Sequence, residues 1–199
     1  MRLFVAIDLT DDARAEVARL QRRVAEHLGG RGGLRLVHQE HLHLTLVFIG
    51  EVDEPRAASI GSSMAAPFDV APFELVFGGL GVFPPVGPPR VLWLGVTAGA
   101  DAVGALQQQV CLRLARLAEG PGNNRREWGS ERPFSPHLTL GRWRRSRQSD
   151  GRRALAETVG AVARVPVAAV TLYESRLSSS GPSHLALCHT SLKRTAESV

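Results

Sequence analysis

The sequence predicts an α+β protein in which helices pack outside antiparallel-rich sheets. Short apolar segments that alternate in hydropathy, as strands do, recur along the chain. Two longer segments repeat apolar residues at helical spacing, and each follows a predicted strand. The tetrapeptide His-Leu-Thr-Leu occurs twice, at 43–46 and 137–140. This repeat predicts two similar lobes, each with its own sheet, related by a pseudo-two-fold axis around a central cleft.

The first elements are a strand and a well-capped helix. Residues 2–9 are mostly apolar and predict a buried strand. Thr10 is a good N-cap, Asp11 and Asp12 complement the helix dipole, and the pair Gly29-Gly30 ends the helix. The apolar stripe of that helix consists of Val17, Leu20, Val24 and Leu28. Strands are then expected at 34–37 and 42–49, and a short helix at 55–64.

The remaining elements follow the same reasoning. Strands at 73–80 and 91–96 flank a stiff loop rich in proline and glycine. The second long helix is marked by Val103, Leu106, Val110, Leu114 and Leu117. We expect a loop at 120–132, a strand at 137–141, an exposed arginine-rich segment at 142–153, a short helix at 154–163, strands at 165–173 and 184–192, and a frayed tail from 193.

Length and composition indicate one domain covering residues 1–199, because no linker-like stretch divides the chain. No apolar run approaches the roughly 20 residues that span a bilayer, so we expect no membrane association. The apolar start ends at Asp8 without a cleavage site and is read as a strand. Cys111 and Cys188 lack metal-type spacing. They are expected to be buried free thiols, which favours a cytoplasmic location.

The chain is basic, with a formal net charge of +5, and Lys193 is its only lysine. The arginine guanidinium is a planar, permanently charged fork that suits phosphate. The excess of arginine also fits codon usage in a GC-rich genome, so composition alone leaves both explanations open. The positive charge favours an anionic partner.

The repeated motif carries the chemistry. Alternation along a strand sends the leucines of each copy to the core and the histidine and threonine to the other face. His43 and His137 are then expected to meet in one cleft as a general acid and a general base, each worth about 10²–10⁴-fold in rate. Thr45 and Thr139 are positioned to donate to the non-bridging oxygens of a phosphate. The alternative is a ladder of hydroxyl-bearing side chains with no catalytic role.

Other histidines offer a weaker hypothesis. His41 and His43 share a face and His38 is near, a spacing that suits a metal. The second motif has no histidine neighbour, so a metal site is not favoured. His184 and His189 lie five apart on one predicted strand and are expected to point to opposite faces.

Residues near the second motif suggest how a nucleotide is held. Arg132 precedes Pro133 and Pro136, which stiffen the approach to His137, and it is a candidate phosphate clamp. The alternative for Arg132 is a solvated loop position. Phe83 and Phe134 lie in predicted loops and are candidates for stacking on a base. The alternation around Phe48 predicts a core position instead.

These residues resemble the 2H phosphoesterase superfamily, and within it the bacterial and archaeal RNA 2′,3′-cyclic phosphodiesterases, once called 2′-5′ RNA ligases. The resemblance covers nearly the whole chain. It is carried by the segments 2–7 (RLFVAI), 43–50 (HLTLVFIG), 89–95 (PRVLWLG), 132–142 (RPFSPHLTLGR) and 172–178 (LYESRLS).

The resemblance implies a bilobal fold with the active site between the lobes, and opening of RNA 2′,3′-cyclic phosphate ends to 2′-phosphomonoesters without a metal or other cofactor. It also implies the reverse type of reaction, which joins RNA ends through a 2′-5′ bond without ATP. His43 and Thr45 belong to the first site, His137 and Thr139 to the second. Val47 stands where many relatives have lysine, and His184 where they often have tyrosine.

We therefore expect a hydrolase whose partners are RNA ends or nucleoside 2′,3′-cyclic phosphates, with no obligate protein partner. Because the 3′ oxygen leaves, protonated His43 is predicted to donate to it, while neutral His137 activates water. The alternative function is a basic RNA-binding module without catalysis.

Overall fold

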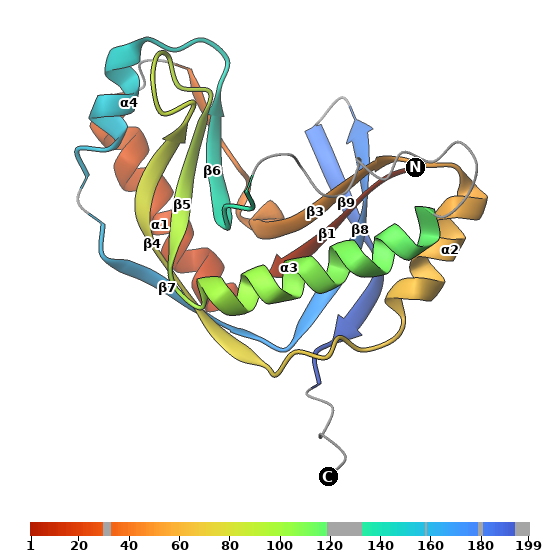
Figure 1. Cartoon of the computed structure of the whole chain (residues 1–199). Helices are drawn as coiled ribbons and strands as arrows, with labels where there is room; N and C mark the ends of the chain where they lie inside the picture. The colour runs from red at the N-terminus through yellow and green to blue at the C-terminus, as the bar shows by residue number, and fades with distance from the viewer. Residues whose placement is uncertain (30–32, 119–132, 158, 179–180, 194–199) are drawn as a thin grey trace.

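The computed structural model describes residues 1–29, 33–118, 133–157, 159–178 and 181–193. Its element types confirm the predicted α+β class, with helices outside antiparallel strands (Figure 1). The strands within these residues are β1 (Arg2–Asp8), β2 (Leu34–Leu36), β3 (His43–Glu51), β4 (Phe73–Phe83), β5 (Val91–Ala98), β6 (His137–Trp143), β7 (Ala161–Val167), β8 (Ala169–Ser178) and β9 (Gly181–Ser191). The helices are α1 (Asp11–Leu28), α2 (Glu54–Met64), α3 (Ala100–Ala115) and α4 (Gln148–Ala154), with 3₁₀ turns η1 (Gln39–His41) and η2 (Arg116–Ala118).

All described strands belong to one sheet, so the prediction of two separate sheets is wrong. The strand order is β7-β4-β5-β6-β3-β1-β8-β9. The short strand β2 lies off this path and pairs with β6. We call β1, β3, β8 and β9 the first half and β4, β5, β6 and β7 the second half. One ladder pair, Leu44 with Leu138, joins the halves through β3 and β6. Without this contact, both motif strands would leave backbone N–H and C=O groups unpaired at the centre of the molecule.

Each of the two long helices follows a strand of one half and packs against the other half. Helix α1 follows β1 of the first half yet packs against β7 of the second, whereas α3 follows β5 and packs against β3. Figure 1 shows α3 running along the first half. The predicted cap of α1 is confirmed, because the Thr10 hydroxyl accepts a hydrogen bond from the Ala13 amide. Gly29 ends the helix in the left-handed conformation.

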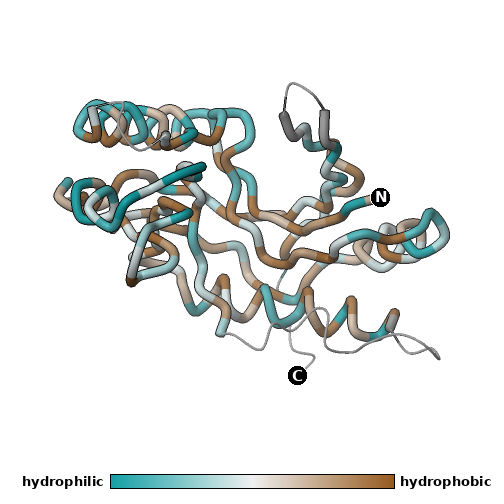
Figure 2. The backbone as a smooth tube through the Cα atoms, turned by 90° about the horizontal axis from the view of Figure 1, so that it is seen from above, coloured by the Kyte–Doolittle hydropathy of each residue, from teal (hydrophilic) through white to brown (hydrophobic). Residues whose placement is uncertain are grey.

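The core lies between the sheet and its helices. The stripe predicted for α1 is fully buried, and burying each such side chain stabilises the fold by about 1.5–3 kcal/mol. In Figure 2 the strands at the centre are largely hydrophobic, while the helices mix hydrophilic and hydrophobic residues along their turns. The largest fully buried side chains are Phe68, Phe77, Leu3, Ile7, Leu20 and Leu42.

The prediction of a helix at 154–163 is wrong. Helix α4 lies earlier, where Asp150 is buried and accepts a hydrogen bond of 2.8 Å from the Arg147 amide. Residues from Ala161 onward instead pair with β4, with Ala163 and Val165 turned into the core. The single strand expected at 165–173 is two strands, because β7 and β8 lie at β4 and β1 in different halves. In both cases the secondary structure depends on pairing with strands that are far away in the sequence.

No helix of the described residues is long and apolar enough to cross a membrane. Cys111 and Cys188 are both free thiols, as predicted, but each is only partly buried. Burial raises the pKa of the Cys111 thiol, which keeps it protonated.

Candidate active site

The two motif strands have the same pattern of burial. In each copy both leucines are buried, and the histidine and threonine are half-buried on the opposite face. The antiparallel pairing of Leu44 with Leu138 sets Thr45 opposite His137 and His43 opposite Thr139. The two histidines are then diagonal neighbours, and residues in such a pair are about 7–8 Å apart. The predicted meeting of both motifs at one place is thus consistent with the strand register.

Both imidazoles are oriented by the same backbone contact. His43 Nδ1 lies 2.8 Å from the carbonyl oxygen of His41, and His137 Nδ1 lies 2.7 Å from that of Ser135. A carbonyl only accepts, so each Nδ1 carries the hydrogen and donates it. In the neutral rings this leaves the Nε2 lone pair available to take a proton. Each motif therefore supplies the carbonyl two residues before its own histidine.

A bulge follows the threonine in each motif strand. On β3 the register with β1 shifts so that Leu46 has no partner, and on β6 the register with β5 shifts in the same way at Leu140. Beyond the bulge the side chains change faces. Phe48 and Arg142 therefore join the face of the histidines and threonines, and both are exposed. The core position predicted for Phe48 is wrong, since its side chain is 65% exposed.

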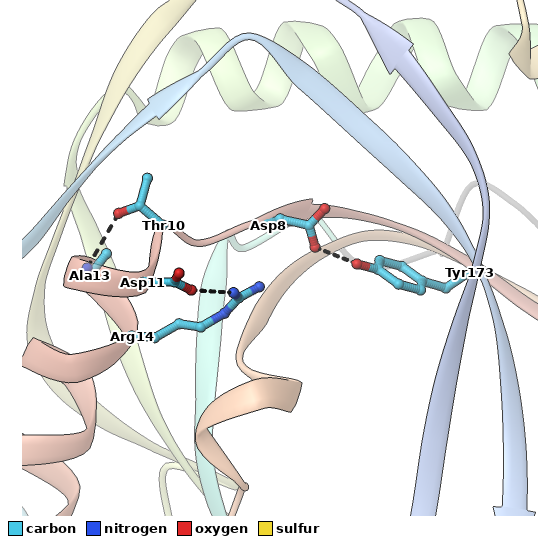
Figure 3. Close-up of polar contacts among 6 residues, drawn as sticks. All are labelled: Asp8, Thr10, Asp11, Ala13, Arg14 and Tyr173. Atoms are coloured by element: carbon cyan, nitrogen blue, oxygen red, sulfur yellow. Dashed lines mark hydrogen bonds and ion pairs between the residues drawn. The ribbon is translucent and has the colours of Figure 1, made fainter.

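A carboxylate lies opposite the first histidine. Asp8 at the end of β1 is the cross-strand partner of His43. Its two carboxylate oxygens accept hydrogen bonds of 2.6 Å from the hydroxyls of Thr171 and Tyr173 on β8, the latter shown in Figure 3. The Thr171 oxygen also lies 2.9 Å from His189 Nδ1. Because the Thr171 proton goes to Asp8, His189 is the donor in that contact.

Aromatic rings surround His43. Phe4 stacks on its imidazole at a centroid distance of 5.0 Å, and His184 meets it edge-on at 5.2 Å. Tyr173 in turn stacks on Phe4 at 5.2 Å. A pocket of about 270 Å³ opens here, and its lining includes Asp8, His41, His43, Tyr173 and His184. His137 does not line this pocket.

The surroundings control the ionisation of these groups. Burial lowers the pKa of His43, while its bond to the His41 carbonyl and the charge of Asp8 act in the opposite direction. Burial and the adjacent imidazoles of His43 and His41 lower the pKa of His184 to about 4. Burial and the hydrogen bond to Asp8 raise the pKa of Tyr173. At neutral pH His184 is thus uncharged and Tyr173 remains a hydrogen-bond donor.

The second histidine has a different environment. Its cross-strand partner is Gly95, so no side chain stands where Asp8 stands in the first half. Phe83 meets His137 edge-on at 5.2 Å, and the Trp93 ring lies 6.1 Å away. The Trp93 ring occupies the space above Gly81, where a Cβ atom would lie 2.0 Å from it. Gly81 is therefore needed for the position of the tryptophan beside His137.

The other predicted site residues have mixed outcomes. Arg132 and the loop expected at 120–132 lie outside the described residues. Phe134 is half-buried and packs against the core. His184 and His189 do not point to opposite faces, because a bulge in β9 at Leu187 places both on the face of Thr171 and Tyr173. Val47, at the position where many relatives have lysine, is buried by the bulge in β3.

The residues missed by sequence reasoning are Asp8, Phe4 and Tyr173. One signal was present: an acidic residue ended an apolar strand at Asp8. The metal hypothesis gains no support, because no group of three or more histidine, cysteine, aspartate or glutamate side chains among the described residues is arranged to hold a metal ion.

Comparisons with known proteins show which family and which solved structures the chain is similar to. A model of the 2′-5′ RNA ligase superfamily matches residues 9–178. An RNA 2′,3′-cyclic phosphodiesterase of Archaeoglobus fulgidus is 36% identical over 147 residues, which cover 73% of this chain and 74% of that protein. The crystal structure of the Thermus thermophilus protein TT0787 matches with a TM-score of 0.75 at 29% identity, covering 99% of this chain and 100% of its own.

A third match contains a nucleotide. The crystal structure of E. coli LigT complexed with 3′-AMP matches with a TM-score of 0.71 at 27% identity, covering 96% of this chain and 97% of its own. The family model covers most of the chain, and the relatives named RNA 2′,3′-cyclic phosphodiesterase cover most of it as well. On these matches, the chain belongs to the 2′-5′ RNA ligase superfamily.

Proposed function

We propose that this protein hydrolyses RNA 2′,3′-cyclic phosphate ends to 2′-phosphomonoesters without a metal ion. Residues 1–199 act as one domain, and each half of the sheet contributes one His-x-Thr motif. The observation that supports this most is the matched pair of imidazoles, each with its Nδ1 hydrogen held by a backbone carbonyl. Two such rings leave two Nε2 atoms for one proton abstraction and one proton donation.

The reaction needs one proton to arrive and one to leave. Water attacks phosphorus and gives its proton to Nε2 of neutral His137. The bond between phosphorus and the 3′ oxygen breaks, and protonated His43 donates from Nε2 to that oxygen. The products are a 3′ hydroxyl and a 2′-phosphomonoester, and the two histidines have exchanged protonation states.

The protonated state of His43 depends on its surroundings. Burial lowers the pKa of His43, opposed by the His41 carbonyl and the charge of Asp8. A bound phosphodiester anion adds a second negative charge within contact of the ring, which favours the imidazolium. Asp8 and the substrate together thus make His43 the better donor, while His137 faces Gly95 and has no carboxylate opposite it.

The threonines bind the charge that develops on the phosphate. Thr45 lies opposite His137 and Thr139 lies opposite His43 by the strand register. Each hydroxyl donates to one non-bridging oxygen and holds phosphorus in line between the two imidazoles. Arg132, in the segment before His137, clamps the same phosphate in this proposal.

The same pair of histidines can also catalyse ligation. When the 5′ hydroxyl of a second RNA replaces water, His137 takes its proton and a 2′-5′ phosphodiester forms without ATP. The balance between hydrolysis and ligation then depends on which nucleophile reaches the phosphorus.

The first test uses a nucleoside 2′,3′-cyclic phosphate with a chelator present, followed by phosphorus NMR. Wild type should yield the 2′-phosphomonoester, and His43→Ala and His137→Ala should each lose about 10²–10⁴-fold in kcat. The matched control is His27→Ala, an exposed histidine on α1. Wild-type rates in both active-site variants would contradict the proposal. RNA binding without turnover by the wild type would favour a binding module.

The second test separates acid from base. In this test the substrate has sulfur in place of the bridging 3′ oxygen. The 3′ sulfur then leaves as a thiolate, because a thiol has a pKa of only about 8.5. This leaving group needs no proton, so His43→Ala should recover most of its lost rate while His137→Ala should not. Recovery in His137→Ala instead would reverse the two assignments.

A further inference from the structure

Two arginines face each other on the same surface as the motifs. Arg35 on β2 and Arg142 on β6 are direct cross-strand partners, and both are exposed. Directly opposed side chains of an antiparallel pair have Cβ atoms about 4.5–5.5 Å apart, and like charges there are destabilising. Neither arginine makes an ion pair or a side-chain hydrogen bond with another described residue. Nothing within the described residues compensates this pair.

The pair lies in line with the second motif. On β5, Gly95, Trp93 and Val91 share one face, and their partners on β6 are His137, Thr139 and Arg142. The bulge at Leu140 is what brings Arg142 onto this face. At about 3.3 Å per residue, the two-residue step from Trp93 to Val91 sets Arg142 about 7 Å beyond Thr139. Arg142, with Arg35 opposite it, therefore lies one step further along the strand than Thr139, on the face where the reacting phosphate is proposed to bind.

We propose that Arg35 and Arg142 form a second phosphate site, which holds the phosphate on the 5′ side of the nucleotide whose cyclic phosphate reacts. Two guanidinium forks that converge from neighbouring strands supply paired donors to one phosphate and lose their mutual repulsion when it binds. The inference rests on the proposed function, because it assumes that the cyclic phosphate lies between the two motifs. It makes the protein selective for RNA ends over single nucleosides.

The test compares three substrates that share the same terminal base. One is a nucleoside 2′,3′-cyclic phosphate, one carries an added 5′ phosphate, and one is a dinucleotide with a 2′,3′-cyclic phosphate end. Wild type should prefer the second and third over the first by about tenfold or more in kcat/KM. The second substrate has a 5′ phosphomonoester and the third has an internal phosphodiester. Comparing the two shows whether the site binds a terminal 5′ phosphate as well as an internal one.

Arg35→Gln/Arg142→Gln removes the site. We expect the ratio of kcat/KM between phosphorylated and unphosphorylated substrates to fall towards one, since the lost contacts involve only the 5′ phosphate. Removing two opposed like charges should not impair folding, and the urea midpoint verifies this. The matched control is Arg22→Gln/Arg152→Gln, which removes equal charge from exposed positions on α1 and α4 and should keep the wild-type ratio.

The outcomes separate the two proposals. Turnover with a wild-type ratio near one would overturn the arginine site and leave the proposed function standing. An equal loss on all three substrates in the double glutamine variant would also overturn it, because the arginines would then serve the reacting phosphate. Turnover of none of the three substrates would overturn both proposals.

Discussion

The two motif strands share their backbone pattern from the histidine through the bulge, and they differ in their surroundings. Both hold the Nδ1 hydrogen of their histidine on the carbonyl two residues earlier, and both bulge after the threonine. Opposite His43 stands Asp8, with Phe4, Tyr173 and His184 around the ring. On the neighbouring strand β5 the residue opposite His137 is Gly95, and Phe83 and Trp93 lie beside the ring. After the bulge, the first strand presents a phenylalanine and the second an arginine.

In the proposed reaction the two copies of the motif have different roles, one as acid and one as base. Strand geometry produces a symmetric pair of imidazoles, which by itself has no preference for which ring is the acid. A single carboxylate on one side removes that symmetry, because it favours the charged form of its own neighbour. Substitutions beside His43 and substitutions beside His137 should therefore have different effects on the reaction. The two threonines are the exception.

The threonines should behave as equals. Thr45→Val and Thr139→Val keep the shape of the side chain but remove the donor, and each should lower kcat by about 10²-fold, or about 2.7 kcal/mol. Thr→Ser at either position keeps the hydroxyl and should retain most of the rate. Steady-state kinetics on a nucleoside 2′,3′-cyclic phosphate measures this. An effect of only one threonine would show that the phosphate is held by one half alone.

Gly81 should matter only to the second half. In Gly81→Ala the new Cβ atom would meet the Trp93 ring at 2.0 Å, so the ring must move. We expect a loss of about 1–3 kcal/mol in the free energy of unfolding, measured in urea, and a lower kcat/KM. The matched control is Gly104→Ala in α3, which has open space around it and should gain about 0.5–1 kcal/mol. Unchanged stability in Gly81→Ala would contradict the packing described beside His137.

Asp8→Asn should act on the first half. The amide keeps the shape of the carboxylate but removes the charge that opposes the lowering of the His43 pKa by burial. The pKa of His43 should fall further, so less of it is protonated, and kcat at pH 7.5 should drop about tenfold. The bell-shaped pH profile of the coupled histidines should move to lower pH. Asp12→Asn, the same change on an exposed carboxylate of α1, should leave the profile in place.

His184→Phe should give the smallest change, in the pH dependence of stability. The pKa of His184 in the folded protein is lowered to about 4, chiefly by burial, from an ordinary value of 6.5. Between these pH values the unfolded chain binds the proton more readily, so the free energy of unfolding falls as pH drops through this window. The phenylalanine variant should lose less between pH 7.5 and pH 5, as urea midpoints would show. An equal loss in both proteins would assign the acid sensitivity to other groups.

Sequence periodicity predicted the strands well but failed where a strand bulged. The alternation of the first motif, extended by two residues, placed Phe48 in the core, and the same reasoning set His184 and His189 on opposite faces. In both cases one extra residue, at Leu46 or Leu187, reversed the faces beyond it. A bulge is created by the pairing strand, so the residues of the bulged strand alone do not reveal it.

Local alternation and capping were enough to establish the α+β class, the capped first helix and the two His-x-Thr strands with their leucines inside. Long-range pairing was needed to show that β3 and β6 are neighbours in one sheet, that Asp8 lies opposite His43, and that Arg142 lies opposite Arg35. These contacts join residues far apart in the chain. They depend on strand register, which is set by the packing of the whole sheet and not by any single segment.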